Sequence, residues 1–180
     1  VDHPNYRAEI PAVGVATLAL GGQGGADIFG GYARYMVAYL EQALRGAIFE
    51  SNDEGEHIVS LSSILPTLPA LQQCQPMMQQ FWQQGLFDGM DRRYFRLVDR
   101  SGGTLSLLAP EFRAGFDTDA RFARFSASFN HPSTKSFYNK MTHYDMVTSL
   151  PALLQVEDRV SMAASLESRG LSARAVAAGD

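Results

Sequence analysis

The sequence predicts a mainly helical fold with one or two parallel strands. Helical spacing of apolar residues recurs along most of the 180 residues, whereas the clearest run that suits a buried strand is residues 15–20. Six glycines follow that run between Gly21 and Tyr32. A strand that leads through glycines into a helix is typical of α/β proteins in which backbone N–H groups approach an anion.

The first half of the chain predicts a series of helices. Apolar residues at helical spacing predict a helix from the glycine-rich turn to about residue 46, and the polar residues 50–57 predict a loop. Pro76 suits the first turn of the next helix, and Gly85 suits its end. Residues 87–100 predict another helix, since acidic residues come early and arginines late, as the helix dipole favours.

The second half predicts fewer elements. Residues 101–135 hold scattered glycines and aromatic residues with little periodicity. Beyond them the spacing predicts one helix that contains Phe137 and Val147, and a last helix that contains Val156 and is closed by Gly170.

Composition narrows the classes of partner and the compartment. A net charge of −4 argues against nucleic acid or an anionic membrane as a partner, because both require a basic surface. Cys74 is the only cysteine, which excludes a disulfide framework and favours a reducing, cytoplasmic setting. No stretch approaches the roughly 18 apolar residues of a membrane-spanning helix. Because the chain begins at Val1 without a methionine, we expect it to be part of a longer protein.

Several isolated features favour structural interpretations. Residues 101–106, SGGTLS, resemble the Ser-Gly-Gly-x-Asp-Ser loop of ATP pyrophosphatases, but Leu105 stands at the aspartate position, so a surface turn is favoured. Cys74 has no histidine nearby in the sequence and is interpreted as a buried or half-buried small residue rather than a nucleophile. His143 and Asp145 are interpreted as a local hydrogen-bonded group on the surface.

Two charged helices leave alternatives open. The arginines of residues 92–100 form a basic edge that is interpreted as solvated or ion-paired. The segment VEDRVSMAASLESR, residues 156–169, has a thin apolar stripe rich in small residues. It suits either a tightly packed helix with internal ion pairs or a helix that a ligand approaches closely.

Two stretches resemble one family. GGQGGADIFGGYARY, residues 21–35, resembles the Ser-Gly-(Glu/Gln)-Gly-(Gly/Ala)-Asp-Glu-Leu-Phe-Gly-Gly-Tyr segment of glutamine-hydrolysing asparagine synthetases. Residues 140–169 resemble the same family's segment that runs through Leu-Pro and Asp-Arg-x-Ser-Met-Ala to Leu-Glu-x-Arg. The two occur in the family's order. The resemblance implies that the chain is part of an α/β adenine-nucleotide α-hydrolase-like (ATP-pyrophosphatase) domain.

The resemblance also implies a reaction and a site. In that family the domain adenylates the aspartate side chain with Mg-ATP, and ammonia from a separate glutaminase domain then attacks the acyl-adenylate. The products are asparagine, AMP and pyrophosphate. The residues implied by the resemblance are Gly21, Gly22, Gly24 and Gly25 for the nucleotide, Gln23, Glu167 and Arg169 for catalysis, and Asp27 for the metal.

The sequence departs from the family pattern at several places. Ala26 stands where the family has its metal-binding aspartate, and Asp27 stands where a glutamate follows. The pyrophosphate loop, the glutaminase domain with its N-terminal cysteine and a downstream lysine are not found in the 180 residues. We therefore expect residues 1–169 to form a partial synthetase domain and residues 170–180 to form an atypical tail.

These departures shape the expected function. ATP and Mg²⁺ are expected to bind the intact parent, a cytoplasmic amidotransferase, whereas the fragment alone is expected to bind nucleotide weakly or not at all and to be inactive. Its partners are expected to be the upstream loop segment, the glutaminase domain, aspartate and ATP. Two alternatives remain: a noncatalytic helical binding module derived from this family, and a family member that acts on another carboxylate, as β-lactam synthetases do.

Overall fold

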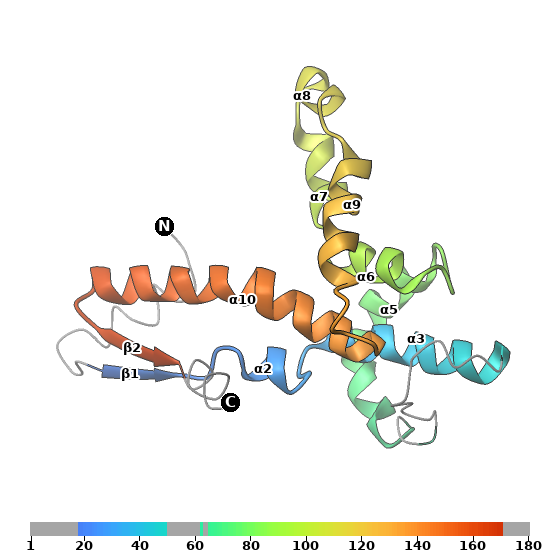
Figure 1. The fold of residues 1–180 in the computed structure, drawn as a ribbon, viewed down its shortest axis with the longest axis horizontal. Coiled ribbons are helices and arrows are strands. Elements are labelled where there is room, and N and C mark those ends of the chain that lie inside the picture. The colour runs from blue at the N-terminus through green and yellow to red at the C-terminus, as the bar shows by residue number, and fades with distance from the viewer. Residues whose placement is uncertain (1–17, 50–61, 63–64, 171–180) are drawn as a thin grey trace. The chain divides into compact units, whose positions relative to one another are not determined.

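The computed structural model describes residues 18–49, 62 and 65–170 (Figure 1). The chain divides into two compact units. One comprises Tyr32–His143, and the other joins Val1–Gly31 to Tyr144–Asp180. The described residues are mainly helical and include one pair of parallel strands, which confirms the predicted fold class.

The strand pair lies in the unit formed by the two ends of the chain. Strand β1 (Leu18–Gly21) pairs in parallel with β2 (Glu167–Gly170), so that Gly21 lies opposite Gly170 (Figure 1). Both strands therefore end at the same edge of the sheet. The short helix α2 (Gly25–Ile28) begins four residues after the end of β1. The predicted strand is thus confirmed over residues 18–20, while its first residues lie outside the described part.

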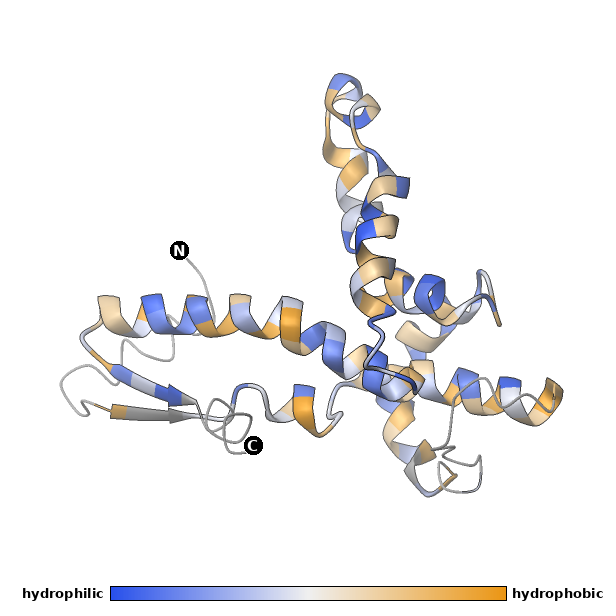
Figure 2. Cartoon of the chain, viewed as in Figure 1, coloured by the Kyte–Doolittle hydropathy of each residue, from blue (hydrophilic) through white to orange (hydrophobic). Residues whose placement is uncertain are grey.

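Helix α10 (Phe137–Ala163) is the long helix that precedes β2. Within the unit of the strand pair, its buried residues Leu150 and Ser161 recur at helical spacing. Leu154 and Glu157 are half-buried on the same face. Polar and apolar residues otherwise alternate along the helix (Figure 2). A carboxylate consequently sits within a stripe that is otherwise uncharged.

The prediction of two separate helices near the end of the chain was wrong. Helix α10 continues through Pro151. It stops at Ala163, where Ser165 adopts a φ of +58° and the Leu166 N–H donates to the Ser161 carbonyl at 2.9 Å. The following residues form β2 because β1 offers a neighbouring backbone that satisfies their hydrogen bonds. Local helical propensity cannot register that distant partner.

The other unit is built from short helices. Its core gathers the buried residues of α3, η2 and α5. The elements, in order, are α3 (Ala33–Phe49), η2 (Leu65–Cys74), α5 (Gln75–Trp82), α6 (Met90–Val98), α7 (Ser101–Thr104), η3 (Leu105–Leu107), α8 (Pro110–Ala114) and α9 (Thr118–Phe129).

The helices predicted around Pro76 and over 87–100 are confirmed as α5 and α6. Pro76 occupies the first turn of α5, and Gly85 adopts a φ of +66° after its end. The helix predicted to reach residue 46 is divided into α2 and α3, because Gly30, with a φ of +69°, lies between them.

The prediction of little regular structure over residues 101–135 was wrong. Helix α9 is capped by Asp117, whose side chain accepts the Ala120 N–H at 2.8 Å. Phe125 and Phe129 are buried, and the Phe129 ring lies 5.4 Å from the ring of Tyr94 on α6. Spaced four apart, these phenylalanines are a helical signal that the glycine-rich flank hid. Residues 101–106 also form helix α7 and the start of η3 rather than a simple turn.

Three smaller predictions have mixed outcomes. Cys74 is half-buried and free, as expected. Asp145 is only 1% exposed, so the interpretation of a surface group with His143 was wrong. The predicted loop 50–57 lies outside the described residues, as do residues 171–180 of the predicted tail.

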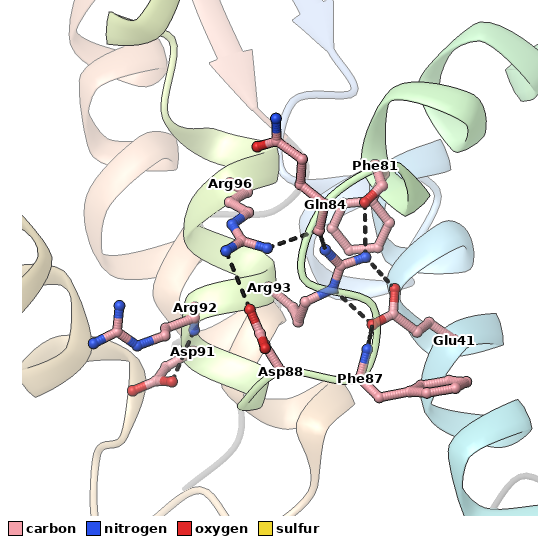
Figure 3. Close-up of polar contacts among 9 residues, drawn as sticks. All are labelled: Glu41, Phe81, Gln84, Phe87, Asp88, Asp91, Arg92, Arg93 and Arg96. Atoms are coloured by element: carbon pink, nitrogen blue, oxygen red, sulfur yellow. Dashed lines mark hydrogen bonds and ion pairs between the residues drawn. The ribbon is translucent and has the colours of Figure 1, made fainter. Parts of the chain in front are cut away.

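A buried ion pair links four segments of the helical unit. Arg93 on α6 and Glu41 on α3 are each 1% exposed and form a bidentate pair (Figure 3). The Arg93 guanidinium also donates to the carbonyls of Phe81 and Gln84, and it lies 3.8 Å from the Phe81 ring centroid. The Phe87 N–H donates to Glu41 at 3.1 Å. The predicted ion-paired arginine edge is thus partly an interior feature.

We predict that breaking this pair destabilises the helical unit strongly. Arg93→Met leaves the Glu41 carboxylate buried without its cation, which costs about 3–5 kcal/mol of unfolding free energy. Arg96→Met is the control, because its pair with Asp88 is about 40% exposed and is worth less than about 1 kcal/mol. Urea denaturation measures both. Equal losses in the two variants would contradict the prediction.

A second ion pair makes stability depend on pH. Burial raises the pKa of Asp99, but hydrogen bonds from Arg121 and Ser101 outweigh burial, so the pKa lies below its usual 3.8. A carboxyl with a lowered folded-state pKa stabilises the fold above its unfolded pKa, and that stabilisation is lost as pH falls through the folded pKa.

We therefore expect Asp99→Asn to reduce unfolding free energy by about 1 kcal/mol at pH 7. The difference from wild type should shrink below about pH 4, because the wild-type carboxyl then becomes protonated as well. Denaturation curves across pH measure the effect. A difference that stays constant down to pH 2 would show that charge plays no part.

Candidate functional site

The glycine-rich turn lies at the carboxyl end of β1. The chain leaves the strand at Gly21, and the Gly25 N–H then donates to the Gly22 carbonyl at 3.2 Å. Gly24 caps α2 with a φ of +88°, a left-handed conformation that favours glycine. In open α/β sheets, ligands bind beyond the carboxyl ends of the strands. The turn therefore occupies the position of a ligand site.

The four glycines assigned to the nucleotide have different structural reasons. Gly24 needs its positive φ. A methyl group at Gly21 would lie 2.8 Å from Oε1 of Glu157, so packing against α10 favours glycine there. At Gly22 and Gly25 an added methyl group would meet no atom of the described residues within 4 Å, and neither residue has a positive φ. The fold does not require glycine at these two positions.

Gln23 and Asp27 lie in the same turn and helix as the glycines. Asp27 is 1% exposed on α2, and Gln23 is half-buried between Gly22 and Gly24. All six predicted site residues of the segment 21–27 thus lie between the last residue of β1 and the third residue of α2. Among the described residues, no three His, Cys, Asp or Glu side chains are grouped so that they could hold a metal ion.

Glu167 and Arg169 lie on β2, not on the predicted helix. They are more than half exposed and pair with each other at 2.8 Å. In the register they lie opposite Leu18 and Leu20 of β1. Residues alternate between the faces of a strand, so both point to the face opposite that of Ser168. Parallel pairing places these residues on β2, beside the strand that leads into the turn. Their side chains lie on the face of the sheet that does not carry Glu157.

Glu157 is a residue of this region that the sequence reasoning missed. Its Oε1 accepts the Ser168 hydroxyl at 2.7 Å and approaches Gly21. Its Oε2 is buried and has no hydrogen-bond partner among the described residues. One carboxylate thereby joins α10 to both strands. One sequence pattern could have identified Glu157: it lies at helical spacing with Leu150, Leu154 and Ser161, on the buried face of the helix.

The two parallel strands end together at a glycine-rich turn, and a long helix packs on one face of them. This arrangement defines an α/β domain of the type that binds ligands at the ends of its strands. The family model described as Asparagine synthase matches residues 8–170. The chain belongs to this family, whose domain has an adenine-nucleotide α-hydrolase-like fold. Membership supports an ATP-dependent, synthetase-type function at the family level.

Searches of curated proteins and of solved structures give no significant match to the chain. Within the part of the chain that the structure describes, no helix is both long and apolar enough to cross a membrane.

We predict that Gly21 and Glu157 are energetically coupled. Gly21→Ala should lower unfolding free energy by about 1 kcal/mol, because the new methyl group displaces the carboxylate from Ser168. In a Glu157→Ala background the same change should cost nothing. A double-mutant cycle measures the coupling.

Gly22→Ala is the matched control, since its methyl group would meet open space. It should leave stability unchanged or raise it slightly, because alanine restricts the unfolded chain. Equal effects of Gly21→Ala with and without Glu157 would refute the coupling.

Proposed function

We propose that this chain is part of the synthetase domain of an ATP-dependent asparagine synthetase. The domain would adenylate the side-chain carboxylate of aspartate, and ammonia derived from glutamine would then attack the acyl-adenylate. The observation that supports this proposal most directly is the open space at Gly22 and Gly25. Glycines that the fold does not require, at the carboxyl end of parallel strands, suit the close approach of a nucleotide to the backbone.

In the proposed site each residue has a limited role. Gly21, Gly22, Gly24 and Gly25 would let the AMP moiety and the acyl group lie against the backbone, beside the Gln23 amide. Catalysis of this kind depends on positioning and on stabilising the developing charge. The exposed pair Glu167 and Arg169 is proposed to help hold the reacting groups.

Magnesium does not fit the described residues as a protein-held ion. The side chain of Ala26 has no oxygen to offer, and Asp27 is the one carboxylate of the turn. Magnesium is usually held by one or two carboxylates together with waters and substrate phosphates, so Asp27 would hold it only with a nucleotide bound. No group of three candidate side chains in the described ranges forms a site made of protein ligands alone. We therefore assign no step to the metal.

The sequence contains no intact match to the pyrophosphate loop that would bind the triphosphate. SGGTLS is the segment that resembles the pyrophosphate loop, and it forms surface helix in the other unit. We propose that the loop is supplied by another segment, so the chain alone binds nucleotide weakly and is inactive.

We expect AMP to bind the turn with a dissociation constant in the millimolar range. Titration with AMP should shift the amide NMR signals of Gly22 and Gly25. Gly22→Val should abolish these shifts with little loss of stability, because an added Cβ there would meet no described atom within 4 Å. Gly103→Val is the control, since Gly103 is equally open on α7 but far from the turn in the sequence.

Two results would contradict this proposal. Low-micromolar binding, about −8 kcal/mol, would mean that a complete nucleotide site exists in the chain. No shift at the turn even at high AMP concentration would favour the noncatalytic binding module, which Ala26 in place of the family's aspartate already suggests. If AMP binds, the substrate is identified by measuring ATP–pyrophosphate exchange with aspartate and with other carboxylates. This assay uses the protein together with the segment that supplies its pyrophosphate loop.

A further inference from the structure

The Glu157 carboxylate is held in a specific position between three elements. Ser168 on β2 fixes Oε1 through a 2.7 Å hydrogen bond, and Gly21 on β1 allows the same oxygen to approach the strand. The helix that carries Glu157 is buried along this face at Leu150 and Ser161. The orientation of the carboxylate is therefore set by a helix and two strands, not by a flexible loop.

The second carboxylate oxygen lacks a partner. Oε2 of Glu157 is buried, and no donor among the described residues reaches it. The described ion pairs also do not include Glu157. An unsatisfied buried acceptor costs about 1–3 kcal/mol, more when it is charged, so native structures usually supply a donor. A ligand is one source of that donor.

The chemistry of the site favours a donor with N–H groups over a metal ion. A magnesium ion requires near-octahedral oxygen coordination, whereas an N–H group can donate to a single carboxylate oxygen. No group of three metal-binding side chains occurs in the described ranges. The carboxylate also lies beside Gly21, next to the open turn at Gly22.

We propose that Glu157 binds an ammonium group at the carboxyl end of β1. This inference rests on the proposed function and deepens it, because ammonia is the nucleophile in the proposed reaction. The Oε2 atom accepts an N–H from the ligand, while Ser168 holds Oε1 and keeps the carboxylate in place. The ligand is either the free ammonium ion or the primary ammonium of an amine.

The test titrates the chain with ammonium chloride and follows the amide NMR signals of Gly21 and Ser168. Tetramethylammonium chloride at the same concentration is the salt control, because this cation has no N–H donor. Methylammonium chloride separates the two ligand sources, since only a site for free ammonium would reject it. Magnesium chloride tests the metal alternative.

We expect ammonium, and not tetramethylammonium, to shift these signals. Glu157→Gln should weaken the binding by at least tenfold, because the amide retains the shape but loses the charge. Asp158→Asn is the matched control, since Asp158 is the next residue on α10 and is exposed. It should leave the binding unchanged.

Ser168→Ala provides an independent test if Glu157→Gln does not fold. It preserves the carboxylate and removes its anchor, so affinity for ammonium should fall by about three- to tenfold, the worth of one hydrogen bond. The inference is overturned if ammonium and tetramethylammonium act alike, if magnesium alone shifts the signals, or if Ser168→Ala has no effect.

The AMP titration on the same sample separates this inference from the proposed function. Ammonium binding without AMP binding contradicts the proposed function alone. AMP binding without ammonium binding contradicts the assignment of Glu157 alone.

Discussion

The parallel pairing of β1 with β2 is the interaction on which the candidate site depends. It joins segments near opposite ends of the described chain, Leu18–Gly21 and Glu167–Gly170, and it makes both strands end at one edge. Without it, Ser168 would have no reason to lie on the same side as Gly21, and the Glu157 carboxylate would lose its anchor.

The two units solve the problem of buried charge in different ways. In the helical unit, Arg93 and Glu41 satisfy each other and several backbone groups, so the pair is complete and structural. In the unit of the strand pair, one oxygen of Glu157 accepts a hydrogen bond, and no donor in the described part of the chain reaches the other. Because an unsatisfied buried group is costly, the unpaired oxygen of a carboxylate marks Glu157 as a candidate binding residue, whereas the complete pair of Arg93 and Glu41 is structural.

The glycines of the turn are present for different structural reasons. Gly24 is explained by its backbone conformation, and Gly21 by the approach of Glu157. Gly22 and Gly25 are explained by neither. A count of glycines in the sequence treats all four alike, whereas the structure separates those that the fold requires from those that it does not.

The sequence by itself determined the fold class, the strand before the glycine-rich turn, helices α5 and α6, and the family, because these depend on local periodicity and on motif order. Only the tertiary structure decided that residues 167–170 form a strand, since their partner lies far away in the sequence. It also revealed Glu157 beside Gly21, a contact that helix periodicity cannot predict. Local patterns record how a segment can fold, but pairing between distant segments decides which polar atoms are buried together.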